Sequence, residues 1–199
     1  MKHLAVVLLL AVVALGQNST QTSPGSGGKQ ETASANAATA ADLASQVPAP
    51  RAGDVDSKEA ILHAIYDVIS GPIGERDWNR FRSLFVPQAR FTRAGKNPDG
   101  SVSVNLLGVD EFVQLAGNVF KSEAFYENAI VNQVQSYGNI SQVFSSYESR
   151  HAPGEKPFER GVNSIQMLND GKRWWVLSIL WDEERPANPL PREFTKSKK

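Results

Sequence analysis

The chain has 199 residues, with 21 basic and 21 acidic residues, and it contains no cysteine. This length suits one domain of ordinary size. Without cysteine the chain cannot form a disulfide framework, a zinc–thiolate site or a nucleophilic thiol. Its neutral charge argues against a nucleic-acid partner, because binding to phosphates requires a basic face.

The N-terminus has the pattern of a secretory signal peptide. Lys2 precedes an unbroken apolar run at residues 4–15, and Ala14 and Gly16 supply the small residues that precede a cleavage site. The run is shorter than the roughly 20 residues that cross a hydrocarbon core, which disfavours the alternative of an uncleaved anchor. We therefore predict a signal peptide at residues 1–16, cleavage near Gly16, and export to the periplasm or the exterior with no stable membrane anchor.

The next segment, residues 17–53, is rich in Ala, Ser, Thr and Gly and contains no aromatic residue. Such a segment buries too little apolar surface to offset the entropy lost on ordering, so we predict a disordered tail. Every aromatic residue lies between Tyr66 and Phe194. We expect the folded domain at residues 54–191 and a basic, disordered C-terminal end at residues 192–199.

Three helices are predicted in the first half of this domain. A capping box of Asp56 and Glu59 precedes a run of Ile, Leu and Val at helical spacing. Asp77 can cap a second, short helix that ends before Pro87. A third helix is expected to begin near Asp110.

Strands are predicted at residues 89–92, 102–107, 126–137, 140–151, 158–169 and 172–183. Gly138-Asn139 and Asp170-Gly171 suit two-residue hairpin turns, which require positive φ. Helices followed by a long meander define an α+β domain. The expected architecture is a cone-shaped, curved antiparallel sheet with three N-terminal helices packed on its concave face.

Two stretches resemble the nuclear transport factor 2-like (NTF2-like) superfamily, with its SnoaL-like polyketide cyclases and ketosteroid isomerases: DWNRFRSLFVPQARF at residues 77–91 and RWWVLSILWDEE at residues 173–184. Two further phrases, FERGVNSIQ and ERPANPLP, are similar to an uncharacterised exported branch. The resemblance implies the cone fold and either catalysis or plain binding. It also implies that Tyr66 matches in position the tyrosine of the isomerase oxyanion hole. Where those isomerases carry carboxylates after the second helix, this chain has Arg90 and Arg93.

The candidate site follows from the expected register of the hairpins. Two-residue turns pair Arg160 with Trp181 and give one face that is aromatic with dispersed polar groups, as in a small-molecule cavity. The expected ligand-binding residues are Tyr66, Tyr147, Ser149, Arg160, Ser164 and Trp181. The opposite face, which carries Glu127, Glu148, Arg150, Glu159 and Asp182, is interpreted as a solvated rim of ion pairs. A β-bulge would exchange the two faces.

Three functions are compatible with this pattern. The first is an exported protein that binds a small, partly apolar molecule without a cofactor or a metal. The second is a lyase, isomerase or hydrolase in which Tyr66 or Arg160 stabilises negative charge, while His151 or a carboxylate moves the proton. For Arg160 and His151 the competing interpretations are a structural pair and an exposed loop residue. The third is a homodimer formed through a convex sheet face with Val176, Leu180, Ile165 and Met167.

Overall fold

The computed structural model describes residues 39–97 and 99–196. The predicted signal peptide, most of the predicted tail and the last three residues therefore lie outside the described residues. The helices are α1 (Ala40–Ser45), α2 (Lys58–Ile69), α3 (Trp78–Ser83), α4 (Val109–Phe120) and the 3₁₀ turn η1 (Arg192–Phe194). The strands are β1 (Phe85–Lys96), β2 (Val102–Leu107), β3 (Tyr126–Tyr137), β4 (Ile140–Arg150), β5 (Glu159–Asn169) and β6 (Trp174–Glu183). None of the described helices is long and apolar enough to cross a membrane.

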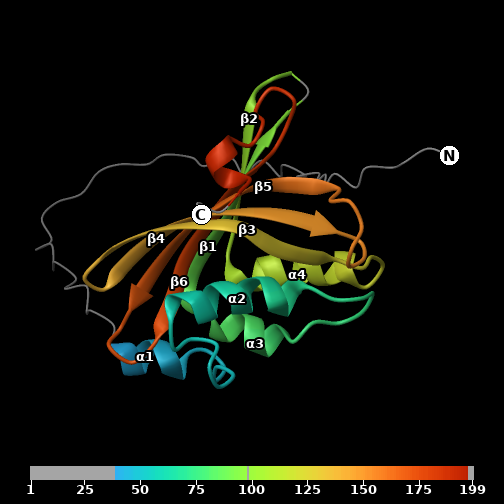
Figure 1. Ribbon diagram of the computed structural model, residues 1–199. Coiled ribbons are helices and arrows are strands. Elements are labelled where there is room, and N and C mark those ends of the chain that lie inside the picture. The colour runs from blue at the N-terminus through green and yellow to red at the C-terminus, as the bar shows by residue number, and fades with distance from the viewer. Residues whose placement is uncertain (1–38, 98, 197–199) are drawn as a thin grey trace, which may run out of the picture. The chain divides into compact units, whose positions relative to one another are not determined.

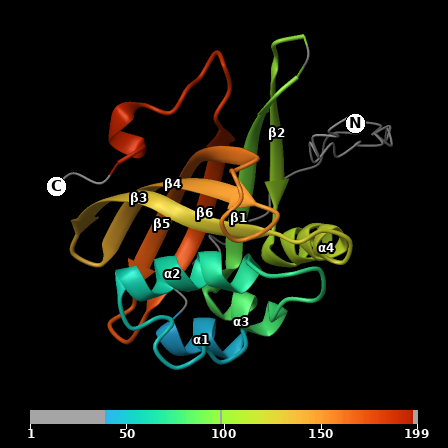
Figure 2. The same cartoon turned by 45° about the vertical axis from the view of Figure 1, so that its right-hand side comes forward.

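The six strands form one sheet in the order β2-β1-β6-β5-β4-β3. Helices α2, α3 and α4 lie together on one side of the curved sheet, which is its concave side (Figure 1). The hairpin of β1 and β2 projects beyond the other strands (Figure 2). The predicted α+β architecture is confirmed, with one difference in detail: β1 runs parallel to β6, so the sheet is mixed.

The helix starts differ from the predictions in two places. Ser57, not Asp56, caps α2, because its backbone is extended and its hydroxyl accepts the Ala60 N–H at 3.1 Å. The predicted cap of α3 is confirmed: Asp77 accepts a backbone N–H at the start of that helix. Helix α1 lies within the segment for which the sequence predicts disorder, and a local capping box at Thr39 closes its first turn.

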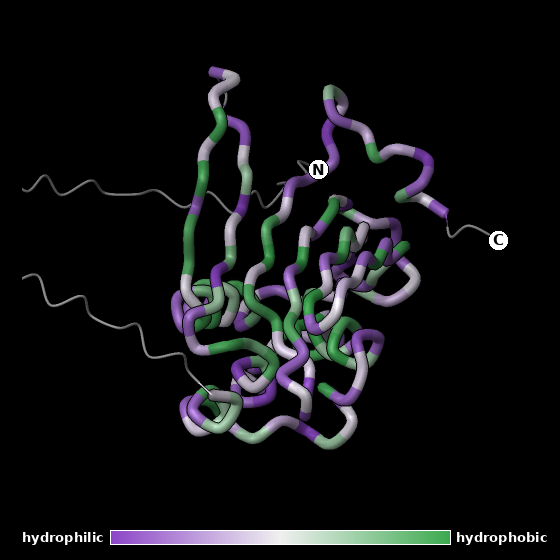
Figure 3. Tube along the Cα trace, turned by 90° about the vertical axis from the view of Figure 1, so that its left-hand side faces the viewer, coloured by the Kyte–Doolittle hydropathy of each residue, from purple (hydrophilic) through white to green (hydrophobic). Residues whose placement is uncertain are grey.

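The core lies between the helices and the concave face of the sheet. Ile61 and Ile65 of α2 pack with Val143 and Ile165 of the sheet, and these side chains are almost completely buried. Each large aliphatic side chain buried in this way contributes about 1.5–3 kcal/mol. Hydrophobic segments of the strands reach into this layer, and others continue along the projecting hairpin (Figure 3).

The β3–β4 hairpin follows the predicted register only near its turn. Tyr137 opposes Ile140 as expected, but Ile130 is an extra residue in β3 and forms a bulge. Beyond it Glu127, and not Asn128, opposes Ser149. The bulge therefore turns Glu127 to the concave face.

The β5–β6 hairpin departs further from the prediction. Its turn is longer than two residues, since Asn169 opposes Trp174, and Leu177 forms a second bulge in β6. Trp181 consequently opposes Asn163, and the predicted pair of Arg160 with Trp181 is wrong. The backbone of Arg160 bonds to that of Glu184 instead.

These two bulges change which side chains lie on each face of the sheet. Tyr147, Ser149 and Trp181 stay on the concave face, where Glu127 and Glu159 join them. Arg160 and Ser164 lie on the outer face, so the predicted face is wrong for both. The predicted convex apolar set also needs correction, because its members Val176, Ile165 and Met167 are buried in the core. Of that set, Leu180 alone is an exposed residue, at 45%.

Candidate functional site

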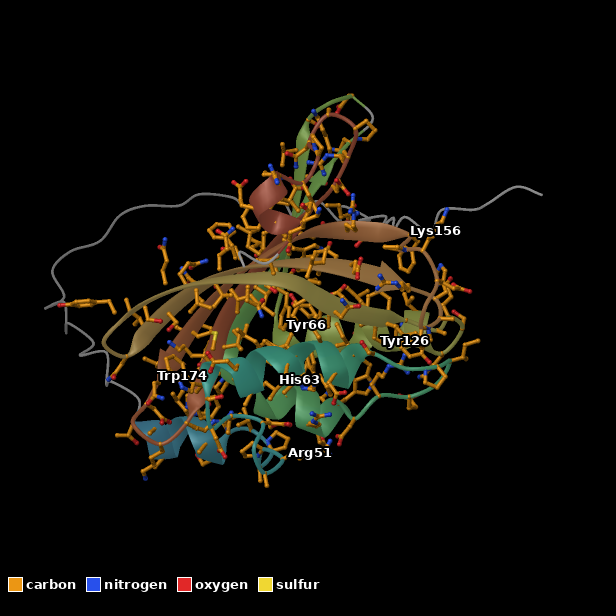
Figure 4. The ribbon with its side chains drawn as sticks, viewed as in Figure 1. Arg51, His63, Tyr66, Tyr126, Lys156 and Trp174 are labelled. Atoms are coloured by element: carbon orange, nitrogen blue, oxygen red, sulfur yellow. The ribbon has the colours of Figure 1, made fainter. Side chains whose placement is uncertain are left out.

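A buried tyrosine marks the centre of the concave face. Tyr66 projects from α2 toward the sheet, whereas the exposed His63 lies on the other side of that helix (Figure 4). The Tyr66 hydroxyl lies 2.5 Å from Ser145 Oγ and accepts a hydrogen bond from Asn163 Nδ2 at 3.1 Å. The tyrosine is thus fixed by two strands of the sheet at once.

Glu127 lies beside this group, at the start of β3. Its Oε2 accepts a hydrogen bond from Ser149 Oγ at 2.8 Å. Although Glu127 as a residue is only half-buried, its carboxyl group is surrounded by protein, and this burial raises its pKa to about 8. The hydrogen bond from Ser149 opposes that shift and the nearby Glu159 adds to it. Within residues 39–97 and 99–196, Glu127 forms no ion pair with a lysine or arginine.

Ser70, the residue after α2, connects these two side chains through their backbones. Its hydroxyl lies 2.7 Å from the carbonyl oxygen of Tyr66 and accepts the backbone N–H of Glu127 at 2.9 Å. The guanidinium of Arg76 stabilises the loop that follows, since it donates to the carbonyl oxygens of four residues between 69 and 74. The loop therefore sets the position of Glu127 relative to Tyr66.

A second polar group on the same face involves Tyr147. The Tyr147 hydroxyl donates to Glu159 Oε1 at 3.1 Å. It passes over Gly161, where an added Cβ would lie 2.6 Å from that hydroxyl oxygen and 2.5 Å from the carbonyl oxygen of Asp182. Burial raises the pKa of Glu159 to about 7, and the charge of Glu183 adds to this effect.

Glu183, at the end of β6, connects this polar group to β1. It forms an ion pair with Arg93 at 2.6 Å, and both side chains are largely buried. Trp181 lies two residues before Glu183 on β6. It packs against the core and stays partly exposed. The concave face thus combines an aromatic wall with hydroxyl, amide and carboxyl groups.

The arrangement permits two kinds of chemistry. A carboxyl group with a pKa near 7 or 8 is available in both protonation states at neutral pH, so it can donate a hydrogen bond or exchange a proton. The Tyr66 hydroxyl and the Asn163 amide are suitable partners for a carbonyl or hydroxyl group. Among the described residues, no cluster of three His, Asp or Glu side chains could hold a metal ion.

The structure brings together four of the residues that the sequence singles out: Tyr66, Tyr147, Ser149 and Trp181. It places the others elsewhere. Arg160 pairs with Glu184 at 2.7 Å on the outer face, and Ser164 accepts a hydrogen bond from Gln142 there. His151 is exposed at the end of β4 and stacks on Phe158, with ring centroids 4.3 Å apart.

Sequence reasoning missed four site residues: Glu127, Glu159, Asn163 and Glu183. A register without bulges places Glu127 and Glu159 on the opposite face, and the predicted site does not include Glu183. One feature of the sequence indicates the first bulge: the apolar run Ala129-Ile130-Val131 interrupts the alternation of β3.

No protein-family model matches this sequence, and no curated protein does so either. Similar solved structures exist. A protein of unknown function from Mycobacterium tuberculosis is 12% identical with a TM-score of 0.50, over 70% of this chain and 78% of that chain. A putative ketosteroid isomerase from Parabacteroides distasonis is 14% identical with a TM-score of 0.46, over 68% and 98%. An NTF-2-like protein of unknown function from Silicibacter pomeroyi is 13% identical with a TM-score of 0.45, over 63% and 92%.

The curved sheet with helices on its concave face agrees with the cone fold that the sequence resemblance implies, and the Mycobacterium tuberculosis protein shares this fold. An identity of 12% shows the fold alone. The function has to be argued from the side chains of the concave face.

Proposed function

We propose that this protein binds a small, partly apolar molecule at the concave face of its sheet, between α2 and strands β3–β6. One observation carries the proposal: the Glu127 carboxyl is surrounded by protein and lacks a cationic partner in the described part of the chain. Burying such a group costs free energy. Costs of this kind are concentrated at functional sites, where a ligand uses the group.

The neighbouring side chains support a ligand with both polar and apolar parts. Tyr66, Asn163 and Glu127 offer hydrogen bonds to one end of it, and Trp181 offers an aromatic surface to the other. The ligand should be uncharged or carry a positive charge, because in the described part of the chain Glu127 and Glu159 form no ion pair, and Arg93 of this face is paired with Glu183.

Binding can be measured with the neutral fluorescent probe N-phenyl-1-naphthylamine on the full chain. We expect one saturable site, weakened at least about tenfold by Trp181→Ala and by Tyr66→Phe combined with Glu127→Gln. Glu148→Gln, on the outer face, is the matched control and should leave affinity unchanged. Equal affinity in all these variants would contradict binding at the concave face.

A specific feature also favours an enzyme of the lyase, isomerase or hydrolase type. Glu127 has a pKa suited to proton transfer, and Ser70 links its backbone to that of Tyr66, whose hydroxyl can stabilise developing negative charge. A minimal test is the conversion of 3-cyclohexen-1-one to its conjugated isomer, followed by ultraviolet absorbance. If Glu127 moves the proton, Glu127→Gln should lower the rate by about 10²–10⁴-fold, and Glu148→Gln should not. The absence of any rate above buffer would remove this candidate and leave binding untouched.

Export remains part of the proposal, supported by the N-terminal pattern alone. A bacterial host that expresses the full gene should release a mature chain beginning at Gln17, which N-terminal sequencing identifies. Retention of Met1 on the mature chain would contradict export by cleavage.

A further inference from the structure

A groove of about 380 Å³ lies on the outer face of the sheet, away from α2, α3 and α4. There η1 folds back over β3 and β4 (Figure 1). Ser146 Oγ donates to the carbonyl oxygen of Phe194 at 2.7 Å, and Gln133 Nε2 donates to that of Glu193 at 3.3 Å. These contacts hold the C-terminal segment in place as one wall of the groove.

The opposite wall contains three glutamines and one phenylalanine, together with Val131, Asn132 and Val134 of β3. Gln133 opposes Phe144 across the β3–β4 ladder, and Gln135 opposes Gln142 two residues further along. Opposed side chains of an antiparallel pair have Cβ atoms about 4.5–5.5 Å apart. The four side chains therefore form one compact surface that lines the groove.

The glutamines keep hydrogen-bonding capacity for a ligand. Gln133 and Gln142 each use only the Nε2 atom, toward Glu193 and Ser164 respectively, so both Oε1 atoms can still accept. In the described part of the chain the amide of Gln135 has no hydrogen-bond partner. Side-chain amides both donate and accept, which matches the dual character of a hydroxyl group.

The charge and polarity of the lining narrow the ligand class. Glu193 is the only charged residue among the described ones that line the groove, and it disfavours an anion. A wholly apolar ligand would strip water from three amides without replacing their hydrogen bonds. A neutral ligand with several hydroxyl groups replaces them. Phe144 is 45% exposed and offers its ring to the C–H face of a sugar ring.

We propose that this groove binds a neutral saccharide of one or two rings. The amides of Gln133, Gln135 and Gln142 bind the hydroxyl groups, and Phe144 packs against the apolar face of the sugar. The volume of about 380 Å³ is at the lower end of the range for ligand sites. The groove lies on the opposite face of the sheet from Tyr66, so the two sites are independent.

The test uses the full chain labelled with ¹⁵N and titrated with maltose, cellobiose and N,N′-diacetylchitobiose. At least one disaccharide should produce saturable shifts of the Gln135 and Gln142 side-chain amide resonances. Gln135→Ala and Phe144→Ala should each weaken that binding at least about tenfold. The control variant Gln114→Ala, at an exposed glutamine on α4, should bind as the wild type does.

Two results would overturn the proposal. One is the absence of saturable shifts with all three disaccharides, or unchanged affinity in Gln135→Ala and Phe144→Ala. The other is a dimer in sedimentation velocity that Phe144→Lys and Leu180→Lys convert to a monomer, while Ile73→Lys, an exposed apolar residue after α2, does not. In that case a second copy of the chain covers the groove, and the protein is a homodimer, as the sequence analysis predicts.

Discussion

Replacing Glu127 by glutamine should stabilise the protein strongly at pH 9 and only slightly at pH 5. In the folded chain, burial raises the pKa of this carboxyl from 4.5 to about 8. The folded state therefore keeps the proton over a pH range in which the unfolded state has lost it. The stability that the group contributes is complete below pH 4.5 and is lost as the pH rises to about 8. A glutamine side chain has no proton to lose and avoids this loss.

The size of the effect follows from the two pKa values. At about 1.36 kcal/mol per pH unit, moving the pKa from 4.5 to about 8 corresponds to at most about 5 kcal/mol at pH 9. At pH 5 the same values give about 1 kcal/mol. The other carboxyl groups of the site are present in both proteins, so their own titration largely cancels in the comparison.

The assay is urea unfolding followed by tryptophan fluorescence at pH 5 and pH 9. Glu148→Gln is the matched control on the outer face. Although burial alone would raise the pKa of Glu148, hydrogen bonds from Arg150 and Asn128 lower it, so this variant should gain nothing at pH 9. If the difference between Glu127→Gln and wild type is the same at both pH values, the reasoning from burial is refuted.

Three further variants test how the site is held, each by the free energy of unfolding in urea. Tyr66→Phe leaves Ser145 and Asn163 without their buried partner and should cost about 1–3 kcal/mol; a loss below about 0.5 kcal/mol would contradict the network. Ser70→Ala should cost about 1–3 kcal/mol, whereas Ser70→Thr keeps the hydroxyl and should retain most of the stability; equal losses would show that the hydroxyl is unimportant. Gly161→Ala places a Cβ 2.5 Å from a backbone oxygen and should cost about 3 kcal/mol, and wild-type stability would show that the strands separate easily there.

Much of the fold could be predicted because its determinants are local. The bounds of β2 (Val102–Leu107) and β3 (Tyr126–Tyr137) agree residue for residue with the predicted strands. Asp77 caps its helix as expected, and Gly138 adopts the positive φ that a tight hairpin turn requires. Periodicity, caps and turns each depend on a few neighbouring residues, so one sequence is enough to recognise them.

The faces of the strands could not be predicted in the same way. A side chain on a strand faces one side or the other according to a count of residues from the turn, and one extra residue reverses every side chain beyond it. Whether a strand contains a bulge depends on the curvature of the whole sheet and on the helices packed against it. The periodicity of α2 predicts the correct direction for Tyr66, whereas a residue count from the turn gives the wrong face for Arg160.

The first bulge decides which chemistry the concave face holds. In a regular ladder Asn128 would oppose Ser149 and Glu127 would lie in solvent, at little cost in free energy. The bulge at Ile130 instead brings the Glu127 carboxyl inside, where ionisation of the carboxyl costs free energy. The fold keeps this less favourable arrangement, and Ser70 and Ser149 add hydrogen bonds that fix it. A group that is buried at a cost in free energy and also held in position is a candidate for use by a ligand, and for this reason we propose the site at the concave face.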